Sequence, residues 1–222
     1  MSRLGPAPSV MEHPVRLELA DVVLNADLSL PPNPRGLIVF AHGSGSSRHS
    51  SRNRAVAEVL HQAQFGTLLL DLLTDDEERT DVVTAEFRFD IPLLGERVVA
   101  AIDWSGAYED TKSLHLGLFG ASTGAAAALI AAARRPNVAR AVVSRGGRPD
   151  LAGDSLPAAV APTLLIVGGH DDVVIELNRR ALEQLRAPKE LQIIPGASHL
   201  FEEPGTLAHA AQLARDWFGS HL

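Results

Sequence analysis

The sequence predicts an α/β protein with a mostly parallel central sheet and helices on both faces. Short apolar runs, such as 36–42, 67–73 and 116–121, are typical of strands that are buried on both sides. Segments with apolar residues at helical spacing separate these runs, and this alternation favours a parallel sheet. A chain of 222 residues that is 45% hydrophobic can bury such a core.

The elements follow one another along the chain with few interruptions. Residues 1–14, rich in prolines and charges, are expected to form a flexible leader, and residues 15–222 a single domain. Residues 15–30 alternate in polarity around Asn25-Ala26-Asp27 and predict an antiparallel hairpin. The remaining predicted elements are strand 36–42, helix 52–64, strand 67–73, an acidic loop at 75–80, a helix around 94–102, strand 114–122, helix 123–134, strand 138–144, a loop at 145–157, strand 162–169, a helix around 177–185, strand 190–195 and a helix near 205–220.

Composition excludes several classes of function. A net charge of −7 argues against a nucleic-acid partner or an anionic membrane surface. The chain has no cysteine, which rules out disulfides and thiolate chemistry. It has neither an apolar run of membrane-spanning length nor the apolar region of a signal peptide. We therefore expect a cytoplasmic protein without a metal or cofactor, and composition leaves a homo-oligomer open.

One serine lies between glycines where a predicted strand meets a predicted helix, in Gly120-Ala121-Ser122-Thr123-Gly124. A G-x-S-x-G turn at such a junction exposes the serine oxygen above the sheet, while the glycines let strand and helix approach closely. A serine hydroxyl needs a base, an acid to orient that base, and donors for an oxyanion. Ser122 is therefore the candidate nucleophile.

Candidates for the base and the acid follow later strands. His199 comes directly after the last predicted strand and is the candidate base. Asp171 and Asp172 follow the strand before it, and either carboxylate could hold the imidazole. Asp150 and Asp154 are weaker alternatives for the acid.

Two backbone N–H groups are expected to form the oxyanion hole. Thr123, directly after the nucleophile, supplies one from a helix N-terminus, where the helix dipole also favours negative charge. The glycine-rich loop HGSGSS at 42–47 follows an early strand, and we assign the second donor to the backbone of Ser44.

The chain places Ser122, Asp171 and His199 in this order, with H-G-S-G early and G-A-S-T-G central. In these features it resembles the α/β-hydrolase superfamily. The segments GGHDDVV and GASHLFEEPG resemble its dienelactone-hydrolase-like branch, and the likeness extends over nearly the whole chain from about residue 15. The resemblance implies Ser122 as nucleophile, His199 as base and Asp171 as acid. It favours Asp171 over Asp172 because Gly168 precedes the acid by three residues.

One departure from the branch concerns the nucleophile. Dienelactone hydrolases carry a cysteine where this chain has Ser122, so the resemblance implies a serine esterase relative rather than an enzyme for dienelactone itself. The expected activity is cleavage of a small-molecule carboxylic ester through an acyl-enzyme. A thioesterase or lactonase with the same triad, and a non-catalytic ligand-binding module, are the alternatives. Residues 144–160 are too few to build a cap domain, so we expect an open site.

Arginines gather in the loops predicted at the catalytic edge of the sheet. Guanidinium groups bind carboxylates and phosphates through paired hydrogen bonds, which favours an acidic ester as substrate. However, lysine occurs only at 112 and 189, so arginines in these loops are expected in any case. The candidate substrate-binding residues are Arg48, Arg88, Arg145 and Arg148, with Arg52 in the same group.

Overall fold

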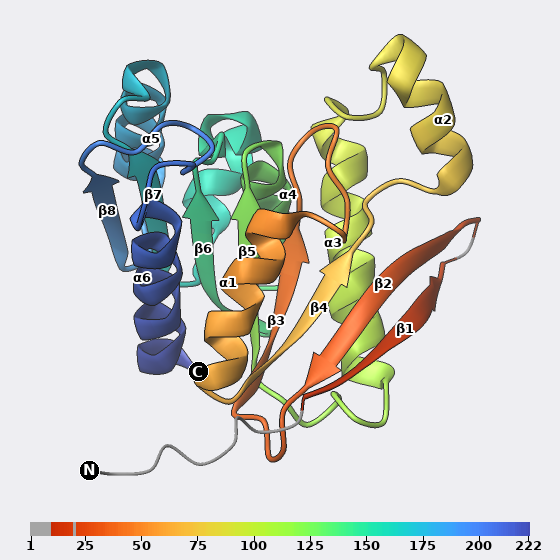
Figure 1. Cartoon of the computed structure of the whole chain (residues 1–222). Helices are drawn as coiled ribbons and strands as arrows, with labels where there is room; N and C mark the ends of the chain where they lie inside the picture. Colours follow the sequence, from red (N-terminus) through yellow and green to blue (C-terminus); the bar gives the residue numbers. More distant parts are fainter. Residues whose placement is uncertain (1–9, 20) are drawn as a thin grey trace, which may run out of the picture.

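The computed structural model describes residues 10–19 and 21–222, and it places eight strands in one sheet with helices on both faces (Figure 1). This confirms the predicted fold class. The strands are β1 (Met11–Glu18), β2 (Val23–Leu30), β3 (Gly36–Ala41), β4 (Phe65–Leu70), β5 (Leu116–Ala121), β6 (Ala139–Arg145), β7 (Thr163–Gly168) and β8 (Lys189–Ile194). The helices are α1 (Ser51–Gln62), α2 (Asp75–Thr84), α3 (Ile91–Ala107), α4 (Thr123–Arg134), the 3-10 helix η1 (Pro149–Ala158), α5 (Asp172–Gln184) and α6 (Thr206–His221).

The order of strands in the sheet is β1-β2-β4-β3-β5-β6-β7-β8. The pairs β1–β2 and β2–β4 are antiparallel, and every other pair is parallel. The chain leaves β3 toward β4 on one side and returns to β5 on the other side. A crevice opens at the carboxyl ends of parallel strands where the strand order reverses in this way. The loops after β3 and β5 therefore meet at a natural ligand-binding position.

Two apolar layers enclose the sheet. Helices α1 and α6 cover one face, and α3, α4, α5 and η1 cover the other (Figure 1). β3, β4, β5 and β7 are buried along their whole length, as their continuous apolar sequences predict. On the face of the sheet that α1 and α6 cover, the rings of Phe40 in β3 and Phe119 in β5 pack with centroids 4.7 Å apart. None of the helices in the described part of the chain is long and apolar enough to cross a membrane.

The N-terminal hairpin is present, but its position differs from the prediction. Strand β1 begins at Met11, inside the expected leader, and ends at Glu18; between it and β2 the Leu19 N–H donates to the Val22 carbonyl. Asn25-Ala26-Asp27 is part of β2, which pairs with both β1 and β4, and Asp27 also forms ion pairs with Arg48 and Arg54. The rest of the expected leader, residues 1–9, lies outside the described residues.

Two segments expected to be loops are helical. The acidic stretch at 75–80 begins α2, where Thr74 and Glu77 form a capping box and the acidic first turn suits the positive end of the helix dipole. The stretch at 145–157 contains η1, which buries Ala152 and Leu156. Short polar segments with good capping residues form helices without an apolar stripe, which is why periodicity missed α2.

A buried carboxylate connects α2 to the loop that follows it. Asp81 accepts hydrogen bonds from the N–H groups of Phe87 at 2.7 Å and Arg88 at 2.9 Å, and from Arg88 Nε at 2.6 Å. Burial by itself would raise the pKa of Asp81, but these hydrogen bonds and the Arg88 charge outweigh it and lower the pKa. Asp81 therefore stabilises the fold in its ionised form.

Replacement of Asp81 by asparagine is expected to lower the free energy of unfolding at pH 7 by roughly 1–3 kcal/mol. A carboxylate with a lowered folded-state pKa contributes stability above its unfolded pKa of about 3.9 and loses it as pH falls through the folded pKa. The difference between wild type and Asp81→Asn should therefore shrink below pH ~4. Urea denaturation at pH 7 and pH 3 measures this; Asp76→Asn, at an exposed position of α2, is the control. An unchanged difference at both pH values would contradict the assignment.

Candidate active site

Ser122 lies in a strained turn between the end of β5 and the start of α4. Its φ of 51° and ψ of −123° are rare for a residue with a side chain. A Cβ added at Gly120 would lie 2.4 Å from the Ala125 Cα, and one added at Gly124 would lie 2.2 Å from the Ala41 carbonyl oxygen. The two glycines are required because β3, β5 and α4 approach one another this closely.

An aspartate and a histidine meet at the same edge of the sheet. Asp171 follows β7, His199 follows β8, and His199 Nδ1 lies 2.6 Å from Asp171 Oδ2. Donation of the Nδ1 proton to the carboxylate leaves Nε2 free to act as a base. Asp172 is instead the exposed first residue of α5, and Asp150 pairs with Arg148. The geometry thus agrees with the choice of Asp171.

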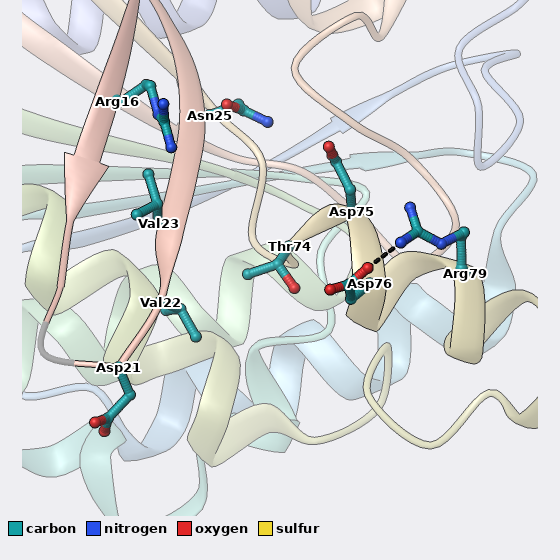
Figure 2. A pocket seen from close by; sticks show the side chains of 9 residues that line it. All are labelled: Arg16, Asp21, Val22, Val23, Asn25, Thr74, Asp75, Asp76 and Arg79. Atoms are coloured by element: carbon teal, nitrogen blue, oxygen red, sulfur yellow. Dashed lines mark hydrogen bonds and ion pairs between the residues drawn. The ribbon is translucent and has the colours of Figure 1, made fainter.

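Ser122 and His199 line one open cavity of about 250 Å³, together with Ser44 and Arg145. The described hydrogen bonds join His199 to Asp171 and not to Ser122. Hydrogen bonds between catalytic groups are often long without substrate and shorten in the complex. A larger cavity, of about 450 Å³, lies between the β1–β2 hairpin and the start of α2 (Figure 2), and none of these groups lines it.

The predicted oxyanion donors lie beside each other. Thr123 is the first residue of α4, where backbone N–H groups lack partners within the helix. The loop after β3 passes so close that a Cβ at Gly43 would lie 2.8 Å from the Ser122 Cβ. The hydroxyls of Ser44 and Thr123 are 3.0 Å apart, and the Ser44 hydroxyl also donates to the Arg88 carbonyl. These contacts tie the two donor segments together.

His42, which the sequence analysis did not select, holds this loop in place. The Leu72 N–H donates to His42 Nε2 at 3.1 Å, so Nδ1 carries the proton and donates to the Gly43 carbonyl at 2.9 Å. Burial lowers the pKa of His42, which favours this neutral form. The sequence signal that could have identified His42 is its place directly between a buried strand and a glycine-rich loop.

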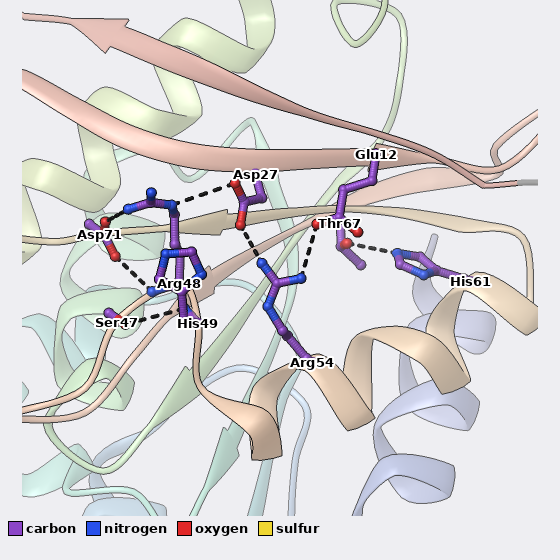
Figure 3. A network of polar contacts seen from close by, with 9 residues as sticks. All are labelled: Glu12, Asp27, Ser47, Arg48, His49, Arg54, His61, Thr67 and Asp71. Carbon is purple, nitrogen blue, oxygen red and sulfur yellow. Dashed lines mark hydrogen bonds and ion pairs between the residues drawn. The ribbon is translucent and has the colours of Figure 1, made fainter.

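Arg48 lies outside the cavity at Ser122. It belongs to a network of charges behind the loop, in which it pairs with Asp71 and Asp27 and Arg54 pairs with Asp27 and Glu12 (Figure 3). The expectation that Arg48 contacts substrate is therefore corrected: its charge is neutralised within the fold.

Arg88 and Arg148 are corrected for the same reason. Arg88 pairs with the buried Asp81, and Arg148 forms two hydrogen bonds with Asp150. Neither lines the cavity at Ser122. Of the candidate arginines, Arg145 and Arg52 line this cavity.

A mostly parallel sheet with a serine at a strained strand-to-helix turn, and an aspartate–histidine pair at the same edge, defines an α/β hydrolase. Residues 25–219 match the dienelactone hydrolase family, and the chain belongs to that family.

Comparison with individual proteins supports the same placement. A structure described as dienelactone hydrolase from Anabaena variabilis is 57% identical, with a TM-score of 0.95 over 96% of this chain and 99% of that one. Est1E from Butyrivibrio proteoclasticus is 16% identical, with a TM-score of 0.78 over 93% and 98% of the two chains. At that identity the likeness shows the fold alone.

A curated relative differs in length. A protein of Mycobacterium tuberculosis named "Putative phosphoribosyl transferase" is 57% identical over 216 residues, which are 97% of this chain and 48% of the relative. The chain therefore spans about half the length of the curated relatives it matches.

Proposed function

We propose that this protein hydrolyses small carboxylic esters through an acyl-enzyme on Ser122. The observation that carries the proposal is the 2.6 Å contact between Asp171 and His199 at the cavity that Ser122 lines. Its family membership supports chemistry on an ester or lactone. A serine nucleophile follows because the chain has no cysteine and Ser122 occupies the strained turn.

The reaction proceeds in two halves. His199 Nε2 takes the Ser122 hydroxyl proton while Oγ attacks the ester carbonyl, and the N–H groups of Ser44 and Thr123 bind the oxyanion. The imidazolium, stabilised by Asp171, then gives its proton to the leaving alkoxide, and the alcohol departs. Water, deprotonated by His199, attacks the acyl-enzyme; the acid is released and the Ser122 hydroxyl is restored.

A lactonase or thioesterase would use the same groups, since only the leaving group differs. The Anabaena relative, described as a dienelactone hydrolase, makes lactones the second candidate. Matched oxyester, thioester and lactone substrates, compared by kcat/KM, separate these activities. Saturable ligand binding without turnover would instead indicate a binding module.

The transferase name of the M. tuberculosis relative calls for a separate proposal. We propose that phosphoribosyl transfer belongs to the part of that relative outside the match, because the matched part is 57% identical to a chain that belongs to the dienelactone hydrolase family. No step of the hydrolysis proposed here requires a phosphoribosyl donor.

Labelling with a fluorophosphonate probe, followed by intact-mass measurement, tests the nucleophile. We expect one probe per wild-type molecule, none on Ser122→Ala, and strongly slowed labelling of His199→Ala, because the hydroxyl is weak without its base. Ser46→Ala is the matched control, since Ser46 lines the same cavity and should leave labelling unchanged. Folded wild-type protein that takes no label would refute the proposal.

A further inference from the structure

We propose that Arg145 and Arg52 form a subsite for a dianionic, phosphate-type group beside Ser122. The inference rests on the proposed function and deepens it: the preferred ester would carry a phosphate monoester or a group of equal charge and shape. The subsite comes from the end of β6 and the first turn of α1, two rigid elements whose side chains meet in the cavity that Ser122 lines.

Arg145 is a buried charge without a counter-charge. It is 7% exposed, and its one described hydrogen bond is a long one of 3.4 Å from Nη2 to the Asn53 side-chain oxygen. Its Nε and Nη1 atoms are buried and lack partners among the described residues. The Phe201 ring, 5.8 Å from the guanidinium carbon, offers only a weak cation–π contact. A buried charge without a partner costs folding free energy unless a ligand of opposite charge neutralises it.

The other candidate arginines at this edge are neutralised by carboxylates of the protein itself and need no charge from a ligand. Arg48, Arg88 and Arg148 each pair with an aspartate. Arg145, which lines the cavity at Ser122, pairs with no aspartate among the residues that the structure describes. A fixed fork of N–H donors without a carboxylate suits an oxyanion with several acceptor oxygens.

Arg52 adds a second positive charge to the same cavity. Its closest carboxylate is that of the exposed Glu202, at 4.0 Å, a surface contact that neutralises little. Burial, followed by repulsion from Arg52, lowers the pKa of Arg145 to about 10, so the Arg145 guanidinium remains charged at neutral pH. The cavity also receives Ser50, the N-cap of α1, where the helix dipole favours an anion.

The charge balance selects the class of anion. A carboxylate would neutralise one of the two guanidinium groups and leave the other uncompensated. A phosphate monoester carries close to two negative charges at pH 8, because its second pKa is about 6, and it offers three acceptor oxygens. The dianion therefore matches the two positive charges that line the cavity.

Binding of methyl phosphate and of acetate, measured by calorimetry at pH 8, tests the subsite. Wild type is expected to bind methyl phosphate about tenfold or more tightly than acetate. Arg145→Met should weaken methyl phosphate binding by about tenfold or more, since hydrogen bonds between charged groups are lost. Arg52→Met should mainly reduce the preference for the dianion. Arg148→Met, which removes a paired arginine outside the cavity, is the matched control and should change neither affinity.

Thermal unfolding separates binding from a structural role. Loss of an uncompensated buried charge should raise the Tm of Arg145→Met, whereas a structural role predicts a lower Tm. Equal methyl phosphate affinity in wild type and Arg145→Met would overturn the proposal, as would absence of binding to wild type. Should Arg145→Met not fold, unchanged affinities for both anions in Arg52→Met overturn it.

The same measurement on Ser122→Ala distinguishes this inference from the proposed function. Methyl phosphate binding does not use the nucleophile, so it should persist in Ser122→Ala. Intact binding by a wild-type protein that takes no fluorophosphonate label refutes the hydrolase alone. Labelling and ester turnover without methyl phosphate binding refute the subsite alone.

Discussion

Replacing Ser122 by alanine is expected to lower kcat for a small ester such as 4-nitrophenyl acetate by about 10⁶-fold, and His199→Ala should cost about the same. In the proposed reaction the two side chains act as one unit, because the hydroxyl attacks only as the imidazole removes its proton. The double variant should therefore be little worse than either single one. Steady-state kinetics, with burst analysis to separate acylation from deacylation, measures the effect.

The proposed acid, Asp171, offers a sharper comparison, because a second aspartate, Asp172, is next to it in the sequence. Asp171→Asn should lower kcat by about 10⁴-fold, since an amide in place of the carboxylate favours the wrong imidazole tautomer. Asp172→Asn is the matched control: this side chain is exposed at the start of α5, so kcat should remain within about twofold, in line with the small effects of most surface substitutions. Equal losses in the two variants would contradict the assignment of Asp171.

The parts of the site that sequence predicted are those fixed by local backbone geometry. A serine between glycines at a strand-to-helix junction is typical of one sharp, strained turn, so Ser122 and Thr123 could be placed from spacing alone. His199 and the neighbouring Asp171 and Asp172 could be placed because carboxyl ends of parallel strands meet at one edge. The resemblance to the dienelactone-hydrolase-like branch then favoured Asp171.

The roles of the arginines could not be predicted, because each depends on a partner from another element. Arg48 is neutralised by Asp71 and Asp27, which lie at the end of β4 and within β2, and nothing near Arg48 in sequence indicates them. Arg145, in contrast, pairs with no carboxylate in the part of the chain that the structure describes. Pairing between distant segments is set by tertiary packing, which apolar periodicity does not encode.

Two features of the proposed site, at Arg145 and Ser122, lower the stability of the fold. Uncompensated charge at Arg145 and positive φ at Ser122 both cost stability, and both lie at the cavity where the proposed chemistry occurs. Arg48, Arg88 and Arg148, the other arginines at this edge that were candidates to bind substrate, have paired charges. Costs of this kind persist where a ligand or a reaction gains from them.

Replacing Gly124 by alanine is expected to be among the most destabilising single-methyl changes in the chain. The added Cβ would lie 2.2 Å from the Ala41 carbonyl oxygen and 2.4 Å from that of His42. Both obstacles are backbone atoms at the end of β3, and no side-chain rotation relieves them. Helix α4 must therefore move away from the sheet, at a cost of about 3 kcal/mol or more in unfolding free energy, a large part of the 5–15 kcal/mol typical of a domain.

Gly106→Ala is the matched control, because it makes the same chemical change in a helix. Nothing lies within 4 Å of a Cβ at Gly106, an exposed position near the end of α3. Alanine there should raise the unfolding free energy by up to about 1 kcal/mol, since glycine loses more backbone entropy in a helix. Urea denaturation of the two variants thus gives shifts of opposite sign. A Gly124→Ala protein as stable as wild type would mean that β3 and α4 are not in direct backbone contact, and the oxyanion donors at Ser44 and Thr123 would then lack the support that holds them together.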